Sequence, residues 1–114
     1  MVRIMGRKFR IDDKKKVISL IEQGQSLAFV SERLQDDKDI VLFAVSRQGY
    51  DLKYASLRLQ GDKDVVKAAV LNDGGVLVYA SKELRNDEEI VTKAIKNNPS
   101  AFVYASKRLR AIKK

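Results

Sequence analysis

Apolar side chains recur along this chain at helical spacing, in groups that end at a glycine or a polar turn. They stand at Ile40, Val41, Ala44 and Val45, then at Val65, Val66, Ala69 and Val70, and again at Ile90, Val91, Ala94 and Ile95. Positions spaced in this way lie on one side of a helix, so each group predicts an amphipathic helix with one buried face.

A second apolar group follows each of these helices. In the clearest copy it consists of Leu52, Ala55 and Leu59, at i, i+3 and i+7, which predicts a second, shorter helix. Alternation of apolar and polar residues, as in a strand, does not persist anywhere along the chain. The pattern therefore predicts an all-α fold.

The two groups together repeat with a period of 25 residues. A Tyr-Ala-Ser motif begins at Tyr54, Tyr79 and Tyr104, and residues 37–61 and 62–86 share 12 identities in 25 without a gap. A helix pair this short cannot bury its apolar faces alone, so the units are expected to stack as an α-solenoid-like bundle. We expect one domain, 1–114, with about four helix-turn-helix units at 12–36, 37–61, 62–86 and 87–111, preceded by a basic arm or capping helix at 1–11.

Each unit carries signals for the ends of its helices. An aspartate opens the first helix and can cap its free amides; these residues are Asp12, Asp37, Asp62 and Asp87. A glycine follows that helix at Gly24, Gly49 and Gly74, where we expect a left-handed backbone. In the fourth unit Asn97-Asn98-Pro99 is expected to do the same, because asparagine tolerates that conformation and proline can open the next helix.

Two further expectations concern stacking. The aromatic residues Phe29, Tyr54, Tyr79 and Tyr104 are expected to form a ladder between successive units. The serines that follow them, Ser31, Ser56, Ser81 and Ser106, are small enough to let helices approach closely.

The first unit departs from the pattern. Lys15 and Lys16 stand where later units have two apolar residues. Either no helix covers that face, or the helix is shifted by one residue so that Val17, Leu20 and Ile21 face inward; the sequence leaves both open. Before this unit, Val2, Met5 and Phe9 at i, i+3 and i+7 have the spacing of a capping helix.

The repeat unit resembles a known family. Its pattern, Asp-x-x-[Ile/Val]-Val-x-x-Ala-[Val/Ile]-x-x-x-Gly-x-x-Leu-x-Tyr-Ala-Ser-x-x-Leu, is spelled by residues 37–59 and 62–84. It is similar to the repeats of domain-of-unknown-function family 4116 over about residues 12–110. The resemblance implies a tandem helical array of the kind found in bacterial and protist proteins. It implies no catalytic or binding residues, because the family defines none.

The amino-acid composition limits the kinds of functional site that the chain can form. The chain has 114 residues, neither cysteine nor histidine, and a net charge of +8. Without those two residue types a tetrahedral zinc site of the usual kind is excluded. No apolar stretch is long enough to span a bilayer, and residues 1–8 lack a signal-peptide core, so a cytoplasmic location is the default, with secretion into another cell left open.

The positive charge belongs to the two ends. Residues 1–16 hold seven basic and two acidic side chains, and residues 107–114 hold five basic and no acidic ones. Residues 17–106 hold 11 basic and 13 acidic side chains. This distribution weakens the inference from a high pI to nucleic-acid binding.

Three motifs resemble a catalytic, a metal-binding or a phosphate-binding site, but each is better explained by its part in the fold. Tyr79-Ala80-Ser81-Lys82 resembles a catalytic pair, yet its first three residues recur in three units, whereas an active site is built once. Asp87-Glu88-Glu89 stands at a predicted helix start, where acids favour the helix dipole. Asn72-Asp73-Gly74-Gly75 matches no phosphate-binding loop. We therefore expect no enzyme activity, no cofactor and no metal site.

The hypothesis favoured by the sequence is a non-catalytic module that binds a protein partner. Variable apolar positions are its candidate contacts: Leu42, Leu57 and Leu71. The alternative is nucleic-acid or other polyanion binding through the basic ends and a basic column on the second helices. Its candidate contacts are Arg7, Lys8, Arg10, Lys14, Lys15, Lys16, Arg33, Arg58, Lys107, Arg108 and Arg110. Homo-oligomerisation through the ends of the array is a third expectation, because uncapped arrays associate.

Overall fold

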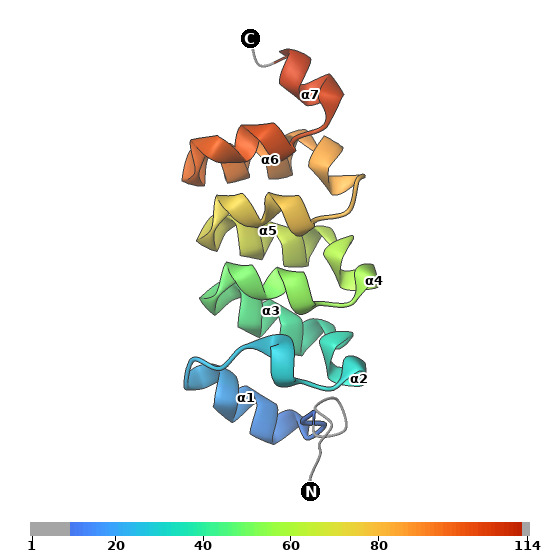
Figure 1. Ribbon diagram of the computed structural model, residues 1–114, viewed down its shortest axis with the longest axis vertical. Helices are drawn as coiled ribbons and strands as arrows, with labels where there is room; N and C mark the ends of the chain where they lie inside the picture. Colours follow the sequence, from blue (N-terminus) through green and yellow to red (C-terminus); the bar gives the residue numbers. More distant parts are fainter. Residues whose placement is uncertain (1–9, 113–114) are drawn as a thin grey trace, which may run out of the picture.

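The units stack into a rod. The computed structural model describes residues 10–112, with principal extents of 56 × 23 × 20 Å. Figure 1 shows α1, α3, α5 and α6 one above another along the long axis, with the short helices α2 and α4 to one side. The α-helices are α1 (Lys14–Glu22), α2 (Glu32–Gln35), α3 (Lys38–Arg47), α4 (Leu57–Gln60), α5 (Lys63–Asn72), α6 (Glu88–Asn97) and α7 (Lys107–Ile112). The 3-10 helices are η2 (Leu27–Phe29), η3 (Gly49–Tyr54), η4 (Gly74–Tyr79), η5 (Leu84–Asn86) and η6 (Pro99–Tyr104).

The long helices begin where the sequence predicts. The carboxylates of Asp37, Asp62 and Asp87 accept hydrogen bonds from the backbone three residues on, at 3.1, 3.2 and 3.1 Å. The predicted apolar faces are buried, apart from the half-buried Ile95. The all-α array is confirmed: the described residues contain no strand, only an isolated bridge between Ile11 and Val30.

The predicted second helix is wrong in detail. Residues 49–54 form a 3-10 helix, Ala55 is extended with ψ 156°, and residues 57–60 form one turn of α-helix. The cause is Ser56, whose hydroxyl accepts from the Leu59 amide at 3.2 Å and caps a new turn. Leu52 and Leu59 still reach the core from the two halves.

The left-handed backbone predicted for the turn glycines is confirmed at Gly24 and wrong at Gly49 and Gly74. Only Gly24 has a positive φ, of 92°, among the described residues. At Gly49 and Gly74 an added Cβ would lie 2.6 Å from the Ala69 oxygen and 2.1 Å from the Ala94 oxygen, in the helix of the next unit. Glycine is required there because two backbones approach closely, and the left-handed explanation is wrong for both positions.

Asparagine does not adopt a left-handed backbone in the fourth unit either. Asn98 is extended, with φ −148°, and its side chain accepts from the Ser100 amide at 3.0 Å. Asn97 instead reaches the neighbouring unit, where Oδ1 accepts from the Gly74 amide at 2.6 Å. Pro99 opens η6, as predicted.

The first unit contains a shifted helix. Asp13, not Asp12, caps α1, accepting from the Lys16 amide at 3.1 Å. Val17 and Ile21 are buried and Leu20 is half-buried, so the second of the two alternatives is correct. The first helix starts 24 residues before α3, whereas α3 and α5 start 25 residues apart, so the start of α1 is one residue out of register with the repeat.

Backbone hydrogen bonds join each unit to the next at the same place. The amides of Ser56, Ser81 and Ser106 donate to carbonyls of the preceding unit at 3.0, 2.9 and 2.8 Å. These serines were expected only to let helices approach closely, but they also cap the following turn and join one unit to the next. Each unit is thus tied through its backbone as well as through its core.

Candidate functional site

The predicted basic column on the second segments is engaged in stacking. Arg58 donates through Nε to Oδ1 of Asp36 at 2.9 Å and through Nη2 to the Asp36 carbonyl at 2.7 Å. The Ser56 hydroxyl donates to the same carboxylate oxygen at 2.6 Å. We call this arrangement, an acid or amide of one unit held by a serine and an arginine of the next, the clamp. Hydrogen bonds from Ser56 and Arg58 hold the pKa of Asp36 below its usual value.

The clamp recurs in two other places. Asn86 is held by Ser106 and Arg108 of the next unit, and Asp12, at the start of the first unit, is held in the same way by Ser31 and Arg33 of its own unit. The third unit lacks it altogether, since Gly61 and Glu83 replace the acid and the arginine. The units that contain the arginine are those in which an acid or amide is available to accept from it, and the third unit has neither. The column is therefore explained by contacts within the rod before any external ligand is invoked.

The remaining polyanion candidates are scattered. Lys14 pairs with Asp37 at 3.2 Å, and Arg110 donates to the Val103 carbonyl at 3.2 Å. Arg10 is half-buried, whereas Lys15, Lys16 and Lys107 are exposed. Arg7 and Lys8 lie outside the described residues. Since α1 and α7 occupy opposite ends of the rod, the structure does not bring the described members of the two basic ends together (Figure 1).

The predicted protein contacts also fail to form one surface. Leu42 is half-buried and packs against the core, while Leu57 and Leu71 are exposed, as expected. Leu57 opens the short helix that leads into α5, and Leu71 lies in the last turn of α5. A ten-residue helix is about 15 Å long, so these two side chains stand well apart.

The motifs that resemble active sites are used for structure. The Ser81 hydroxyl accepts from the Leu84 amide, and Asp87 caps α6. Glu89 pairs with Lys63 and Lys67, at 3.0 and 3.1 Å. Within residues 10–112, no group of acidic side chains is arranged to hold a metal ion. Over the same range, no helix has the length and apolar character needed to cross a bilayer.

The two ends of the array differ. An apolar hollow of about 260 Å³ opens at the first unit; Ile11, Val17, Leu20, Ile21, Gln25, Ser26, Phe29 and Val30 line it. The predicted capping residues Val2, Met5 and Phe9 lie outside the described residues. At the other end, Phe102 is 36% exposed in a position equivalent to the buried Leu77.

The C-terminal end obstructs in-register stacking of a second copy. In the inner units Lys63 pairs with the next cap, Asp87, at 3.1 Å, but Glu88 takes the place of that lysine in the fourth unit. Pro99 takes the place of Gly74, so it brings a Cβ where the inner units have no room. The fourth unit thus differs from the inner units at two positions where those units meet the next one.

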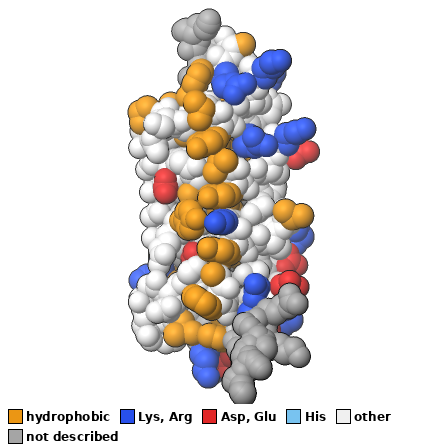
Figure 2. Space-filling model, in the orientation of Figure 1, with side chains coloured by type: hydrophobic (Ala, Val, Ile, Leu, Met, Phe, Trp, Pro, Cys, Tyr) orange, Lys and Arg blue, Asp and Glu red, His pale blue; other side chains and the backbone are white. Residues whose placement is uncertain are grey.

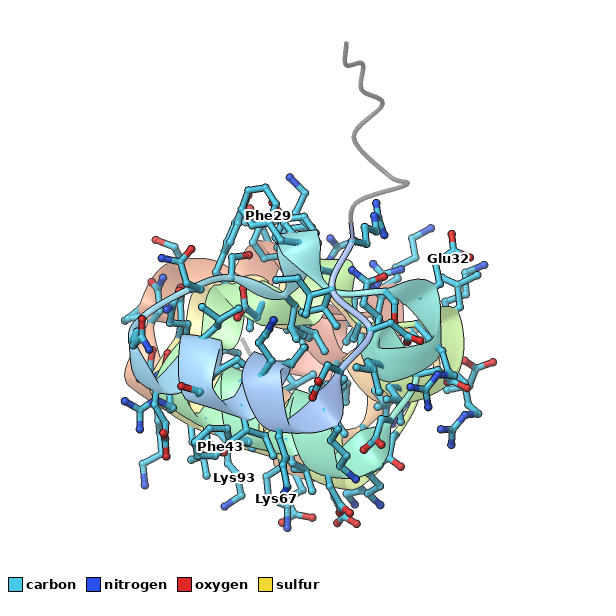
Figure 3. The ribbon with its side chains drawn as sticks, turned by 90° about the horizontal axis from the view of Figure 1, so that it is seen from below. Phe29, Glu32, Phe43, Lys67 and Lys93 are labelled. Carbon is cyan, nitrogen blue, oxygen red and sulfur yellow. The ribbon has the colours of Figure 1, made fainter. Side chains whose placement is uncertain are left out.

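Most exposed large apolar side chains lie on one kind of element. Five of the seven in the described residues, namely Phe29, Tyr50, Val78, Phe102 and Val103, belong to 3-10 helices. Figure 2 shows a column of apolar side chains running along the rod. We define the 3-10 face as Phe29, Tyr50, Tyr54, Val78, Tyr79, Val103 and Tyr104. Figure 3 places Phe29 on the side of the rod opposite Phe43, Lys67 and Lys93.

The aromatic ladder predicted from the sequence is built differently. Tyr50 inserts between units: its ring lies edge-on to Tyr54, with centroids 6.3 Å apart, and to Tyr79, at 5.7 Å. Lys53 lies over the rings of Tyr50 and Tyr54 and donates to the Tyr50 hydroxyl at 3.1 Å. That hydrogen bond lowers the pKa of Tyr50. The signal that sequence reasoning missed was Tyr50 itself, one residue after the turn glycine.

Comparison with known proteins adds a family. The family model described as "Domain of unknown function (DUF4116)" matches residues 13–60 and again 62–110. No curated protein and no solved structure matches the chain. Each match covers two of the 25-residue units, and together they span nearly all of the described residues. The chain therefore belongs to the DUF4116 family.

Proposed function

We propose that this chain is a non-catalytic module that binds a protein partner through the 3-10 face. The observation that supports the proposal is the apolar column itself. Phe29 and Val103 expose 62% and 60% of their surface at the two ends of the column. Contiguous exposed apolar surface is uncommon on a soluble protein, and where it occurs it usually serves binding.

The arrangement of the core supports the same surface. Ion pairs join the long helices, as where Lys38 lies between Asp62 and Asp64 at 3.1 and 3.0 Å. Those carboxylates raise the pKa of Lys38, so the charges there are satisfied within the rod. Lys67, which pairs with Glu89, lies on the side of the rod opposite Phe29 (Figure 3). On the 3-10 face Tyr50 packs against Tyr54 and Tyr79, whereas the exposed surfaces of Phe29, Val78 and Val103 are left available to a partner.

Nucleic-acid binding is the weaker candidate. It needs several free cations on one surface, because affinity for a polyanion comes from neutralising phosphates. Of the candidate contacts on the second segments, Arg33 and Arg58 each face a carboxylate within the rod, so within residues 10–112 only those near the C-terminal end lack an anionic partner. The two basic ends also lie far apart.

A capture experiment tests the proposal. The full chain is immobilised and incubated with lysate of the organism that encodes it, at about 50 and about 300 mM salt and with nuclease in one arm. We expect a protein to be retained after nuclease treatment, and to be lost when Phe29→Ser and Val103→Ser are combined. The matched control combines Leu57→Ser and Leu71→Ser, at positions with 85% and 55% exposure outside the 3-10 face.

Two results would contradict the proposal. In the first, both double variants retain the protein equally, so the 3-10 face is not the binding surface. In the second, recovery depends on nucleic acid and disappears with nuclease. Because all four side chains are exposed or half-exposed, polar replacement leaves the core unchanged.

A further inference from the structure

We propose that the part of the 3-10 face on the third and fourth units binds an acidic amphipathic helix of the partner protein. This inference rests on the proposed function and names the chemistry of its ligand. The apolar half of the ligand would cover Val78, Tyr79, Val103 and Tyr104. Its carboxylates would face the basic side chains of the adjoining short segments.

The charge beside the 3-10 face is uneven along the rod. In the third and fourth units, residues 74–86 and 99–112, five basic side chains accompany one acid, Glu83. The basic residues are Lys82, Arg85, Lys107, Arg108 and Arg110. In the first two units, residues 27–36 and 49–61, three basic side chains accompany three acids. Figure 2 shows the basic side chains of the C-terminal half along one edge of the apolar column.

These basic groups lack anionic partners within residues 10–112. The clamp partner of Arg108 is the neutral Asn86, where Arg58 has the carboxylate of Asp36. Arg85 has a buried Nε that makes no hydrogen bond. None of the ion pairs formed by the described residues involves Lys82 or Lys107. The positive charge here is free to pair with a ligand, unlike that on Arg33 and Arg58.

One side chain joins the basic edge to the apolar column directly. Arg110 donates to the carbonyl of Val103, so its guanidinium lies against η6. A ligand that covers Val103 therefore passes next to a cation. The same segment of a ligand could therefore make apolar contacts with Val103 and pair its charge with Arg110. This favours an amphipathic ligand over a purely charged one.

The spacing suits a helix lying along the rod. Stacked helices are roughly 8–10 Å apart, so equivalent side chains of successive units are separated by about that distance. Two turns of an α-helix rise about 10.5 Å over seven residues. Apolar residues seven apart on the ligand would thus meet equivalent positions, such as Val78 and Val103, in successive units.

A nucleic acid fits this surface less well. Base stacking on proteins uses the faces of aromatic side chains set among basic residues. Here the exposed Val78 and Val103, at 40% and 60% exposure, precede the half-buried Tyr79 and Tyr104 along the chain and offer no such platform. An acidic amphipathic helix would cover the valines with its apolar side and pair its carboxylates with the basic side chains, so it would contact both parts of the surface.

The test measures binding of synthetic probes by fluorescence anisotropy. The main probe is a peptide of about 18 residues, roughly 27 Å as a helix, with leucines on one helical face and glutamates on the other. A second peptide replaces every glutamate by lysine, and a third contains the residues of the first in scrambled order. A single-stranded DNA oligonucleotide is the fourth probe.

Charge reversal of the full-length protein identifies the surface. The variant combines Lys82→Glu and Lys107→Glu, both at exposed positions. The matched control combines Lys15→Glu and Lys16→Glu, an equal change of charge on exposed residues at the far end of the rod. We expect the first pair to weaken the acidic peptide at least about tenfold, and the second to leave its Kd within about twofold. Val103→Ser is expected to weaken it too, whereas Leu71→Ser is not.

Each other outcome overturns the inference. Equal binding of the acidic, lysine and scrambled peptides would show that neither charge nor helical pattern matters. Preference for the DNA probe, or equal losses with both lysine pairs, would assign the charge to a polyanion or to long-range attraction. If the acidic peptide fails to bind while the lysate protein is still captured through the 3-10 face, this inference fails and the proposed function stands. If capture fails too, both fall.

Discussion

The close approach of one unit's turn to the next unit's helix can be tested with one methyl group. In Gly74→Ala the new Cβ would lie 2.1 Å from the Ala94 oxygen and 3.0 Å from its carbonyl carbon, whereas ordinary contacts begin near 3.4 Å. The neighbouring atom belongs to backbone, so no side chain can rotate away. Either α6 or η4 must move by about an ångström.

The expected cost follows from two contributions. Overpacking of a well-packed contact typically destabilises by about 1–3 kcal/mol. The movement also lengthens the 2.6 Å hydrogen bond from the Gly74 amide to Asn97, worth about 1 kcal/mol. Gly74→Ala should therefore reduce the free energy of unfolding by about 2–4 kcal/mol, measured by urea denaturation and far-UV circular dichroism.

Two other glycines serve as controls. Gly61 has an ordinary φ of −104°, and its nearest contacts to an added Cβ are at 3.6 Å, so Gly61→Ala should stabilise by about 0.4–1 kcal/mol. Gly24 has open space but a φ of +92°, so Gly24→Ala should cost about 1–2 kcal/mol through its backbone alone. If Gly74→Ala and Gly61→Ala differed by less than about 0.5 kcal/mol, the close-approach explanation would be refuted.

Three further predictions concern other joints of the array. Combining Gly61→Asp with Glu83→Arg installs the missing clamp, and should raise the free energy of unfolding by about 1 kcal/mol more than the two single changes together; simple additivity in the urea titrations would contradict it. Asp51 is 1% exposed, and its Oδ2 has no hydrogen-bond partner among residues 10–112. Burial raises the pKa of Asp51 above the usual 3.8, so its ionisation opposes folding progressively as pH rises from about 4 through the raised pKa. Asp51→Val, which copies the buried Val76 at the equivalent position of the third unit, should gain stability relative to the native chain as pH rises over that window, by about 1–3 kcal/mol at pH 7; a pH-independent difference would be the opposite result. Combining Glu88→Lys with Pro99→Gly should restore an inner-type end and produce concentration-dependent association by light scattering, and a strictly monomeric variant would show that these two residues do not limit stacking.

The sequence was sufficient for the repeat, the aspartate caps and the buried helix faces. These features depend on local spacing, which a single chain displays directly. The broken second helix was also encoded locally, in the serine that starts a new turn at Ser56. It was overlooked because Leu52, Ala55 and Leu59 fit a continuous helix equally well.

Other features depend on contacts between units and leave no local signal. The reason for Gly49 and Gly74 is visible only once the next helix is in place. The half-buried position of Leu42 and the pairing of Arg58 with Asp36 likewise follow from stacking. The apolar column was missed because its positions vary along the repeat, with Lys53 standing where later units have valine.

The missing clamp at Gly61 has a consequence for how the rod comes apart. The two family-model matches meet at this residue, so the array consists of two two-unit halves joined where one set of side-chain ties is absent. In a stack stabilised by nearest neighbours, the weakest joint sets the size of the cooperative unit. Because the clamp is absent there, packing of α3 against α5 and the ion pairs of Lys38 with Asp62 and Asp64 have to hold the second and third units together. A partner that spans this joint would then increase cooperativity, binding two halves into a single folding unit.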